Sequence, residues 1–274
     1  MIMAPGPDGE PRASGGTSTT PPAGDLHRAR EGATDELSGR VIVVAGATGA
    51  AGPAVVRRLV ASGATVVAAA RNAGSLQAVI DGANDATVRG DGAGRALPAV
   101  IDLMDDGATT AWGAEVARQH GHVDGLVHLV GGWRGGQSIT AMDLRDWDVL
   151  HDLLIRTLQH TTRAFHDALA ASDDARLAII STVQVAKPSS DNAAYAAAKA
   201  AAEAWTLAVA DSFSASHAAA VVLRIKALLT PAMREKKPEA KFSGFTPVAD
   251  LAQTVNDLWL TPADDLNGRI LCLT

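Results

Sequence analysis

The sequence is poor in several features whose absence narrows what the chain can be. It has one cysteine among 274 residues, Cys272, which excludes an internal disulfide and fits a reducing compartment, so we expect a cytoplasmic protein. No apolar run reaches the roughly 18 residues that a membrane-spanning helix needs. The formal net charge of −6, without a basic cluster, argues against a nucleic-acid partner. The histidines form no His-Glu-x-x-His arrangement, so no metal site is expected.

Residues 1–38 differ in composition from the rest of the chain. Pro, Gly, Ser and Thr dominate residues 5–24, no periodic apolar pattern is present, and the apolar core of a secretory signal is missing. We therefore expect a disordered N-terminal arm over residues 1–38. With 47% hydrophobic residues, the chain has enough apolar surface for one globular domain, which we place at residues 39–274.

The only tyrosine, Tyr195, is followed four places later by Lys199 in an alanine-rich stretch. Alanine favours helix strongly, so the two side chains should lie one turn apart on the same face. An ammonium beside a phenol lowers the phenol's pKa from about 10, which lets it exchange a proton near neutral pH. The plain alternative is a half-buried tyrosine and a surface lysine.

A glycine turn follows the first apolar run. Residues 41–45 read as a buried parallel strand, and an amphipathic helix begins at about Pro53. Between them, Gly46, Gly49 and Gly52 allow the backbone to bend tightly and to approach a pyrophosphate at the helix N-terminus. The alternative is a tight turn with no ligand.

The next strand, at residues 64–70, ends in Arg71 and Asn72. A dinucleotide site for NAD has an acidic residue there, which accepts hydrogen bonds from the free ribose 2′-hydroxyl. A cation suits a 2′-phosphate instead, so NADP(H) is favoured over NAD(H). A solvated arginine is the alternative.

Strands and helices alternate along the rest of the chain. Residues 83–95 are expected to form a surface loop, and a long helix is expected over residues 144–171. The further strands are expected at 97–103, 123–130, 177–180, 219–225 and 269–273, and the further helices around Trp112, from Tyr195 to Phe213, and from Thr246. This alternation predicts an α/β fold with a doubly wound parallel sheet, Rossmann-like, in a single domain.

Three features together resemble the short-chain dehydrogenase/reductase family, over about residues 37–274. They are the turn Gly46-x-x-Gly49-x-x-Gly52, Asp102 after the third strand, and Thr182 thirteen places before Tyr195-x-x-x-Lys199. The resemblance implies an NADP(H)-dependent oxidoreductase that interconverts a carbonyl and an alcohol on a small-molecule substrate.

The resemblance also implies roles for individual residues. Tyr195 would exchange the proton, Thr182 would hydrogen-bond the carbonyl oxygen, and Lys199 would lower the phenol's pKa and hold the nicotinamide ribose. Family relatives commonly pair through the long helix and the tyrosine helix, so a homodimer or homotetramer is expected. The implied cofactor-binding residues are Gly46, Thr48, Gly49, Gly52, Arg71, Asp102, Gly131, Lys199 and Thr230.

The chain departs from the family pattern at several places, among them Thr182, where a serine is usual, and the spacing of the glycines in the turn. His128-Leu129-Val130-Gly131 replaces Asn-Asn-Ala-Gly, Leu154 replaces an asparagine of the long helix, and residues 226–231 shorten the usual Asn-x-x-x-Pro-Gly loop. A leucine cannot hold the water that the asparagine is thought to hold. These departures leave a second hypothesis open, a non-catalytic dinucleotide-binding sensor or scaffold.

Two further predictions concern surfaces. Arg134, in the glycine-rich loop after the fourth strand, is a candidate to bind a substrate carboxylate or phosphate, with a solvated arginine as the alternative. Small residues on the tyrosine helix, such as Ala204, would let another helix approach closely, and Phe165 would add apolar surface on the long helix.

Overall fold

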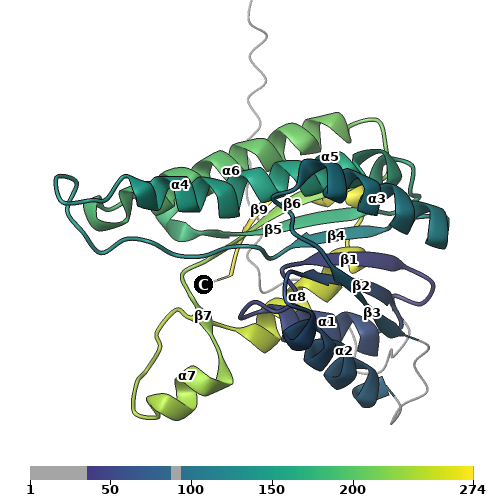
Figure 1. Cartoon of the computed structure of the whole chain (residues 1–274), viewed down its shortest axis with the longest axis horizontal. Coiled ribbons are helices and arrows are strands. Elements are labelled where there is room, and N and C mark those ends of the chain that lie inside the picture. Colours follow the sequence, from purple (N-terminus) through teal and green to yellow (C-terminus); the bar gives the residue numbers. More distant parts are fainter. Residues whose placement is uncertain (1–35, 88–93, 274) are drawn as a thin grey trace, which may run out of the picture.

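The computed structural model describes residues 36–87 and 94–273 (Figure 1). Its centre is a seven-stranded parallel sheet in the order β3-β2-β1-β4-β5-β6-β9. The chain winds outward from β1 in one direction to β3 and then in the other from β4 to β9, which confirms the doubly wound fold. The strands are β1 Val41–Ala45, β2 Thr65–Ala70, β3 Arg95–Val100, β4 Gly125–His128, β5 Arg176–Thr182, β6 Ala219–Ile225 and β9 Ile270–Cys272.

Helices cover both faces of the sheet (Figure 1). One face carries α1 Gly52–Ala61, α2 Ala73–Thr87 and α8 Val248–Asp257. The other carries α3 Asp106–His120, α5 Thr157–Ala170 and α6 Ala193–Ser212. Each layer has its own apolar core, and all five residues of β1 are buried between the two. This two-sided burial explains why the strands read as continuous apolar runs.

The predicted long helix is present, with an irregular turn in its middle. It consists of α4 Arg145–His151, a π-helical segment Asp152–Arg156, and α5. In the turn after the π segment, the Thr157 hydroxyl donates to the backbone carbonyl of Leu153 at 2.8 Å. A single π turn of this kind is common near functional sites, and nothing in the apolar periodicity of the sequence indicated it.

Helix α2 differs from the sequence prediction, which assigned residues 83–95 to a surface loop. Leu76, Ile80 and Ala83, spaced i, i+4 and i+7, are all buried against the core. The Asn72 side chain accepts a hydrogen bond from the Ser75 backbone at 2.9 Å, at the N-terminus of the helix. The helix therefore continues to Thr87, and residues 88–93 lie outside the described part of the chain.

Several boundaries also differ from the prediction: the fourth strand was expected over residues 123–130 and spans Gly125–His128. Strand β3 ends at Val100 instead of Leu103, because its partner strand β2 ends at Ala70, which lies opposite Val100. Leu37 is fully buried in the core and its N–H donates to the carbonyl of Ser62, so it belongs to the folded domain and not to the arm. The rest of the predicted arm, residues 1–35, lies outside the described residues and stays a prediction.

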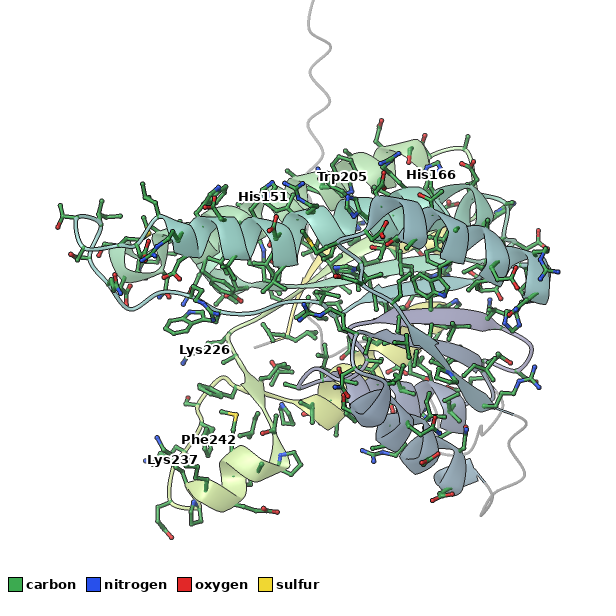
Figure 2. All side chains as sticks on the ribbon, viewed as in Figure 1. His151, His166, Trp205, Lys226, Lys237 and Phe242 are labelled. Atoms are coloured by element: carbon green, nitrogen blue, oxygen red, sulfur yellow. The ribbon has the colours of Figure 1, made fainter. Side chains whose placement is uncertain are left out.

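A small lobe that the sequence did not predict projects from the carboxyl edge of the sheet (Figure 1). Strands β7 Leu228–Leu229 and β8 Thr246–Pro247 pair in parallel, and α7 Pro231–Lys236 lies between them in the chain. Figure 2 shows Lys226 on the stretch that joins the sheet to this lobe, and Lys237 and Phe242 out on the lobe itself.

The remaining short elements are α9 Ala263–Leu266 and three 3₁₀ turns, Val183–Val185, Ser190–Asn192 and Leu258–Leu260. Within the described residues, no helix is both long and apolar enough to cross a membrane. No group of three or more His, Cys, Asp or Glu side chains in that same part of the chain is arranged to hold a metal ion.

Candidate active site

The glycine turn is shaped by close contact with the end of β4. Gly46 has a φ of +82°, and a Cβ on it would lie 2.8 Å from the backbone nitrogen of Val130. A Cβ on Gly52 would lie 2.0 Å from the carbonyl oxygen of Ala47. No larger residue fits at either position without moving the backbone. The turn therefore brings the start of α1 against the ends of β1 and β4, which is the switch point of the sheet.

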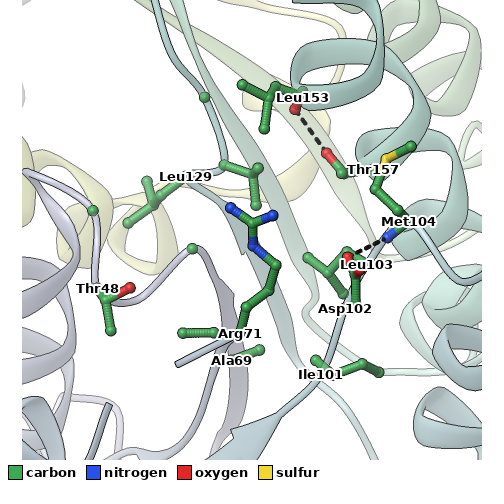
Figure 3. A pocket seen from close by; sticks show the side chains of 15 residues that line it. Thr48, Ala69, Arg71, Ile101, Asp102, Leu103, Met104, Leu129, Leu153 and Thr157 are labelled. Carbon is green, nitrogen blue, oxygen red and sulfur yellow. Dashed lines mark hydrogen bonds between the residues drawn. The ribbon is translucent and has the colours of Figure 1, made fainter. Parts of the chain in front are cut away.

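A cavity of about 250 Å³ opens beside this turn, and we call it the Arg71 cavity (Figure 3). Arg71 extends into it from the end of β2, and Asp102 lies on its far side, where its carboxylate accepts a hydrogen bond from the Met104 N–H at 3.1 Å. Six of the residues predicted to bind the cofactor line this cavity: Gly46, Thr48, Gly49, Arg71, Asp102 and Gly131.

A second cavity of about 370 Å³ adjoins the first, and we call it the Tyr195 cavity. Tyr195, Lys199 and Thr182 all line it, although Thr182 comes from β5 and the other two from α6. The two cavities share Gly49 and residues 129–131, so they form one continuous cleft along the carboxyl edge of the sheet. Ligands bind along this edge in open α/β sheets.

Three predicted residues stand apart from these linings. Gly52 packs under the glycine turn instead of facing a cavity. The Thr230 hydroxyl accepts a hydrogen bond from the Met233 N–H at 3.2 Å and so caps helix α7. Arg134 lines neither cavity: it donates to the carbonyl of Trp133 and lies 3.7 Å from Asp146.

The phenol of Tyr195 lies in an apolar environment. Its ring packs against a small cluster that includes Leu150, Leu154 and Ala198. Burial raises the pKa of Tyr195 above its ordinary value of 10. The prediction that Lys199 lowers this pKa is therefore wrong. Burial removes water from around the phenolate, which disfavours the charged form and raises the pKa.

Lys199 is fixed by a backbone contact. Its Nζ donates to the carbonyl oxygen of Ile180, the residue two places before Thr182, at 2.6 Å. Burial lowers the pKa of Lys199 to about 8, and the charge of Glu203 opposes part of that shift. An ammonium has three donors, so two remain for a bound ligand.

A buried ion cluster supports the floor of the Tyr195 cavity, and sequence reasoning missed it. Glu203 is 4% exposed and accepts hydrogen bonds from the Ser181 hydroxyl at 2.5 Å and from Arg224 Nε at 2.8 Å. Glu203 lies four residues after Lys199 and therefore shares its helix face, and Ser181 directly precedes Thr182. This spacing relative to the predicted site residues was the one sequence signal for the ion cluster. The cluster joins β5, α6 and β6 directly behind the catalytic candidates.

His128 occupies the first position of the departure from Asn-Asn-Ala-Gly. It is buried, with Nε2 at 3.3 Å from the Thr157 hydroxyl and Nδ1 at 3.1 Å from that of Thr161. Burial, aided by the charge of Lys199, lowers the pKa of His128 to about 3. The ring is therefore neutral near pH 7 and connects β4 to α5.

Comparison with known proteins agrees with this geometry. The sequence model of the short chain dehydrogenase family matches residues 40–241. A short chain dehydrogenase of Pseudocercospora fijiensis is 28% identical over 167 residues, which are 61% of this chain and 52% of the relative. The chain thus spans about half the length of that relative.

Solved structures show the same fold. A short-chain type dehydrogenase/reductase from Mycobacterium ulcerans has a TM-score of 0.77 at 21% identity, over 86% of this chain and 89% of the other. A metagenomic short-chain oxidoreductase in complex with NADP has a TM-score of 0.72 at 25% identity, over 88% and 99%. NAD⁺-bound xylitol dehydrogenase has a TM-score of 0.74 at 16% identity, over 86% and 98%, a likeness of fold alone. From the family match over most of its length, the chain belongs to the short-chain dehydrogenase family.

Proposed function

We propose that the protein is an NADP(H)-dependent oxidoreductase that interconverts a carbonyl and an alcohol on a small-molecule substrate. One observation carries the proposal: Tyr195, Thr182 and Lys199 line a single cavity that continues into the cavity of Arg71. A nucleotide extended along this cleft would have its phosphate-bearing end near Arg71 and its reactive end near Tyr195.

The residues present fit a nicotinamide dinucleotide. Gly46, Thr48 and Gly49 of the glycine turn line the Arg71 cavity just before the start of α1, so a pyrophosphate can approach backbone N–H groups there. Arg71 would hold a 2′-phosphate by charge-assisted hydrogen bonds, which favours NADP(H). Asp102 would lie near the adenine, and Thr48, Gly49 and Gly131 along the cleft, whereas Thr230 caps α7 and has no place in either lining. The cofactor, when bound, supplies or accepts the hydride.

The chain's own residues handle the proton. Because burial raises the pKa of Tyr195, the phenol keeps its proton at neutral pH and can donate it to the substrate carbonyl oxygen. The Thr182 hydroxyl accepts a hydrogen bond from the Gln184 N–H at 3.3 Å, which leaves its own proton for the same oxygen. The Lys199 ammonium adds positive charge beside the developing alkoxide, so the charge forms among groups already in place.

Leu154 affects how this site is built. It is buried and packs in the same apolar cluster as the Tyr195 ring, and its side chain lies beside Gly131. It therefore supports the phenol by packing, where the family's asparagine would contribute a polar amide. No observation in the described residues or in the comparisons favours the non-catalytic sensor or scaffold.

The proposal is tested by NADPH oxidation against a broad panel of carbonyl compounds, with the Tyr195→Phe variant as the comparison. Removing the hydroxyl should lower kcat by about 10²-fold or more, while NADPH affinity stays nearly unchanged because the ring still packs. Thr206→Ser, on the far part of α6, is the control and should keep its activity. A Tyr195→Phe enzyme that retains most of its kcat would exclude the proton-donor role.

We further propose that two copies of the chain pair through α4 and α6. Ala204 is exposed on α6, Leu144 is 72% exposed just before α4, and Val149 is 38% exposed on α4. Phe165, which we expected in this interface, is instead fully buried, in edge contact with Trp112 in the core. Light scattering should show that Ala204→Glu converts the predicted homodimer or homotetramer into a monomer. A monomeric unmodified chain would refute the pairing.

The single Cys272, free and exposed, supports the cytoplasm as the place of action.

A further inference from the structure

The lining of the Tyr195 cavity has positive charge and no negative charge. Lys199 and Lys226 are its two charged residues, and no Asp or Glu side chain is among the described residues that line it. Lys199 is occupied in part by the carbonyl of Ile180 and lies beside the reacting groups. Lys226 is therefore the cation that faces the remainder of the cavity.

Within the described part of the chain, the hydrogen bond and the ring contact of Lys226 are with uncharged groups. Its Nζ donates to the backbone carbonyl of Ser243 at 2.9 Å and lies 6.0 Å from the ring centroid of Phe245. None of the ion pairs within residues 36–87 and 94–273 includes it. These contacts hold the ammonium in place without neutralising its charge, and two of its three donors remain for a ligand.

The lobe beyond Lys226 has the same sign of charge. Residues 227–247 contain four Lys or Arg and two Glu, although the whole chain has a formal net charge of −6. Figure 2 shows Lys226 at the base of this lobe, next to the sheet. A local excess of cations at the mouth of a cleft raises the concentration of anions there, so the lobe would attract an anionic molecule toward the Tyr195 cavity.

An aromatic side chain forms another part of the wall. Trp133 is 55% exposed, and its indole Nε1 donates to the Asn192 side chain at 3.1 Å. A second hydrogen bond fixes the loop that carries Trp133: the Gly136 N–H donates to the carbonyl of Asp191 at 2.7 Å. The indole is thus a fixed apolar surface that can contact a flat or aliphatic group. Leu129, Ile180, Ile225 and Leu228 make the rest of the cavity apolar.

We propose that the substrate combines an apolar, ring-bearing body with a carboxylate, and that Lys226 binds the carboxylate. The substrate would then be a keto acid in the reductive direction and the corresponding hydroxy acid in the oxidative one. The carbonyl faces Tyr195 and Thr182, and the apolar body lies against Trp133. This assignment rests on the proposed function for the reaction, whereas the anion site rests on Lys226 alone. It also moves the anion-binding role that the sequence suggested for Arg134 to Lys226.

The first experiment compares matched substrates. Aryl keto acids and their methyl esters share the carbonyl and the body, and differ only in the charge. With the full-length chain and NADPH, kcat/KM should be higher for the acid. Lys226→Met should lower it about tenfold to a hundredfold for the acid and far less for the ester, since a hydrogen bond to a charged group is lost only there. Lys226→Arg should keep the preference, and Lys237→Ala, on the lobe but outside the cavity, should lower the value for the acid far less than Lys226→Met does and leave the value for the ester unchanged.

A binding measurement separates failure of this inference from failure of the proposed reaction. Isothermal titration of the NADPH-loaded protein with an aryl carboxylate and with its neutral amide should show tighter binding of the carboxylate, lost in Lys226→Met. Such binding without turnover of any carbonyl would refute the reaction and retain the anion site. Equal affinities for carboxylate and amide would overturn the anion site even if carbonyls are reduced. If Lys226→Met raises the KM for NADPH with every substrate, Lys226 binds the cofactor, and the proposed site for a substrate carboxylate would also be overturned.

Discussion

The two cavities of the cleft are built in different ways. The Arg71 cavity is formed mainly by short local segments: the glycine turn after β1, the end of β2 and the end of β3. The Tyr195 cavity combines side chains from β5, α6 and the start of the lobe, and a buried Glu203–Arg224 ion pair lies behind it. The binding signals of the first could be read from motifs of a few residues, whereas the second also depends on the Glu203–Arg224 pair, which joins residues 21 positions apart and belongs to no motif. A local change should therefore affect the first cavity through binding and the second through stability.

Removing Arg224 should have the largest effect on the protein. Arg224→Ala leaves the Glu203 carboxylate, 4% exposed, with Ser181 as its remaining partner in the cluster. An unpaired buried charge costs about 3–5 kcal/mol, so the free energy of unfolding by urea should fall by that amount. Since Ser181 adjoins Thr182, kcat should fall as well.

Two comparisons sharpen this result. The double variant Arg224→Leu, Glu203→Leu removes both charges and should recover most of the stability, because an apolar pair often replaces a buried ion pair at little cost. Arg163→Ala removes an exposed pair with Asp106, at 3.1 Å, and should cost at most about 1 kcal/mol. Equal losses in Arg224→Ala and Arg163→Ala would mean that the buried cluster has no special role.

A substitution in the Arg71 cavity should change the affinity for the cofactor and leave the free energy of unfolding unchanged. Arg71→Ala should weaken NADPH binding by about tenfold to a hundredfold, because a charge-assisted hydrogen bond contributes about 1.5–3 kcal/mol, and it should leave NADH binding nearly unchanged. Fluorescence titration with both cofactors measures this. Arg57→Ala, on the first helix, is the control. Equal losses for NADPH and NADH would assign Arg71 a structural role.

The smallest expected effect is a pH dependence confined to the Tyr195 cavity. The ammonium of Lys199 is present below its pKa of about 8 and is lost as pH rises through that value. Burial moves loss of the Tyr195 proton to above pH 10, so the lysine titrates first. kcat/KM for reduction should therefore fall above about pH 8, approaching tenfold per pH unit. In Lys199→Arg the guanidinium stays protonated, so this decline in kcat/KM should disappear. A decline that persists in the variant would mean that another group titrates near pH 8.

Much of the fold followed from the sequence because the relevant signals are local. Apolar strands, the glycine turn and the alanine-rich helix of Tyr195 are patterns of five to ten residues, and all were predicted close to their observed bounds. Helix α2 was missed because its buried residues, Leu76, Ile80 and Ala83, stand among exposed ones next to Gly- and Asp-rich sequence. The lobe was missed because each of its strands has two residues, too few to show any periodicity.

The chemistry of the site was less accessible from the sequence. The spacing of Tyr195 and Lys199 correctly brought both into one cavity with Thr182, but it gave the wrong direction for the pKa of Tyr195. That direction depends on how many apolar atoms surround the phenol, which only tertiary packing decides. The partnership of Glu203 with Arg224 likewise joins a helix to a strand 21 residues away, and no short motif encodes it.

The π segment Asp152–Arg156 makes one place in the long helix tolerant of a one-residue change in chain length. A π turn holds one residue more than an α turn while the helix on either side keeps its course. A one-residue deletion within this segment would leave regular α-helix and keep Phe165 on the face that packs against the sheet. The same deletion within α5, before Leu169, would rotate every later residue of the helix by about 100° and move Leu169 out of the core. Insertions and deletions accumulated during descent should therefore be concentrated in these five residues of the helix.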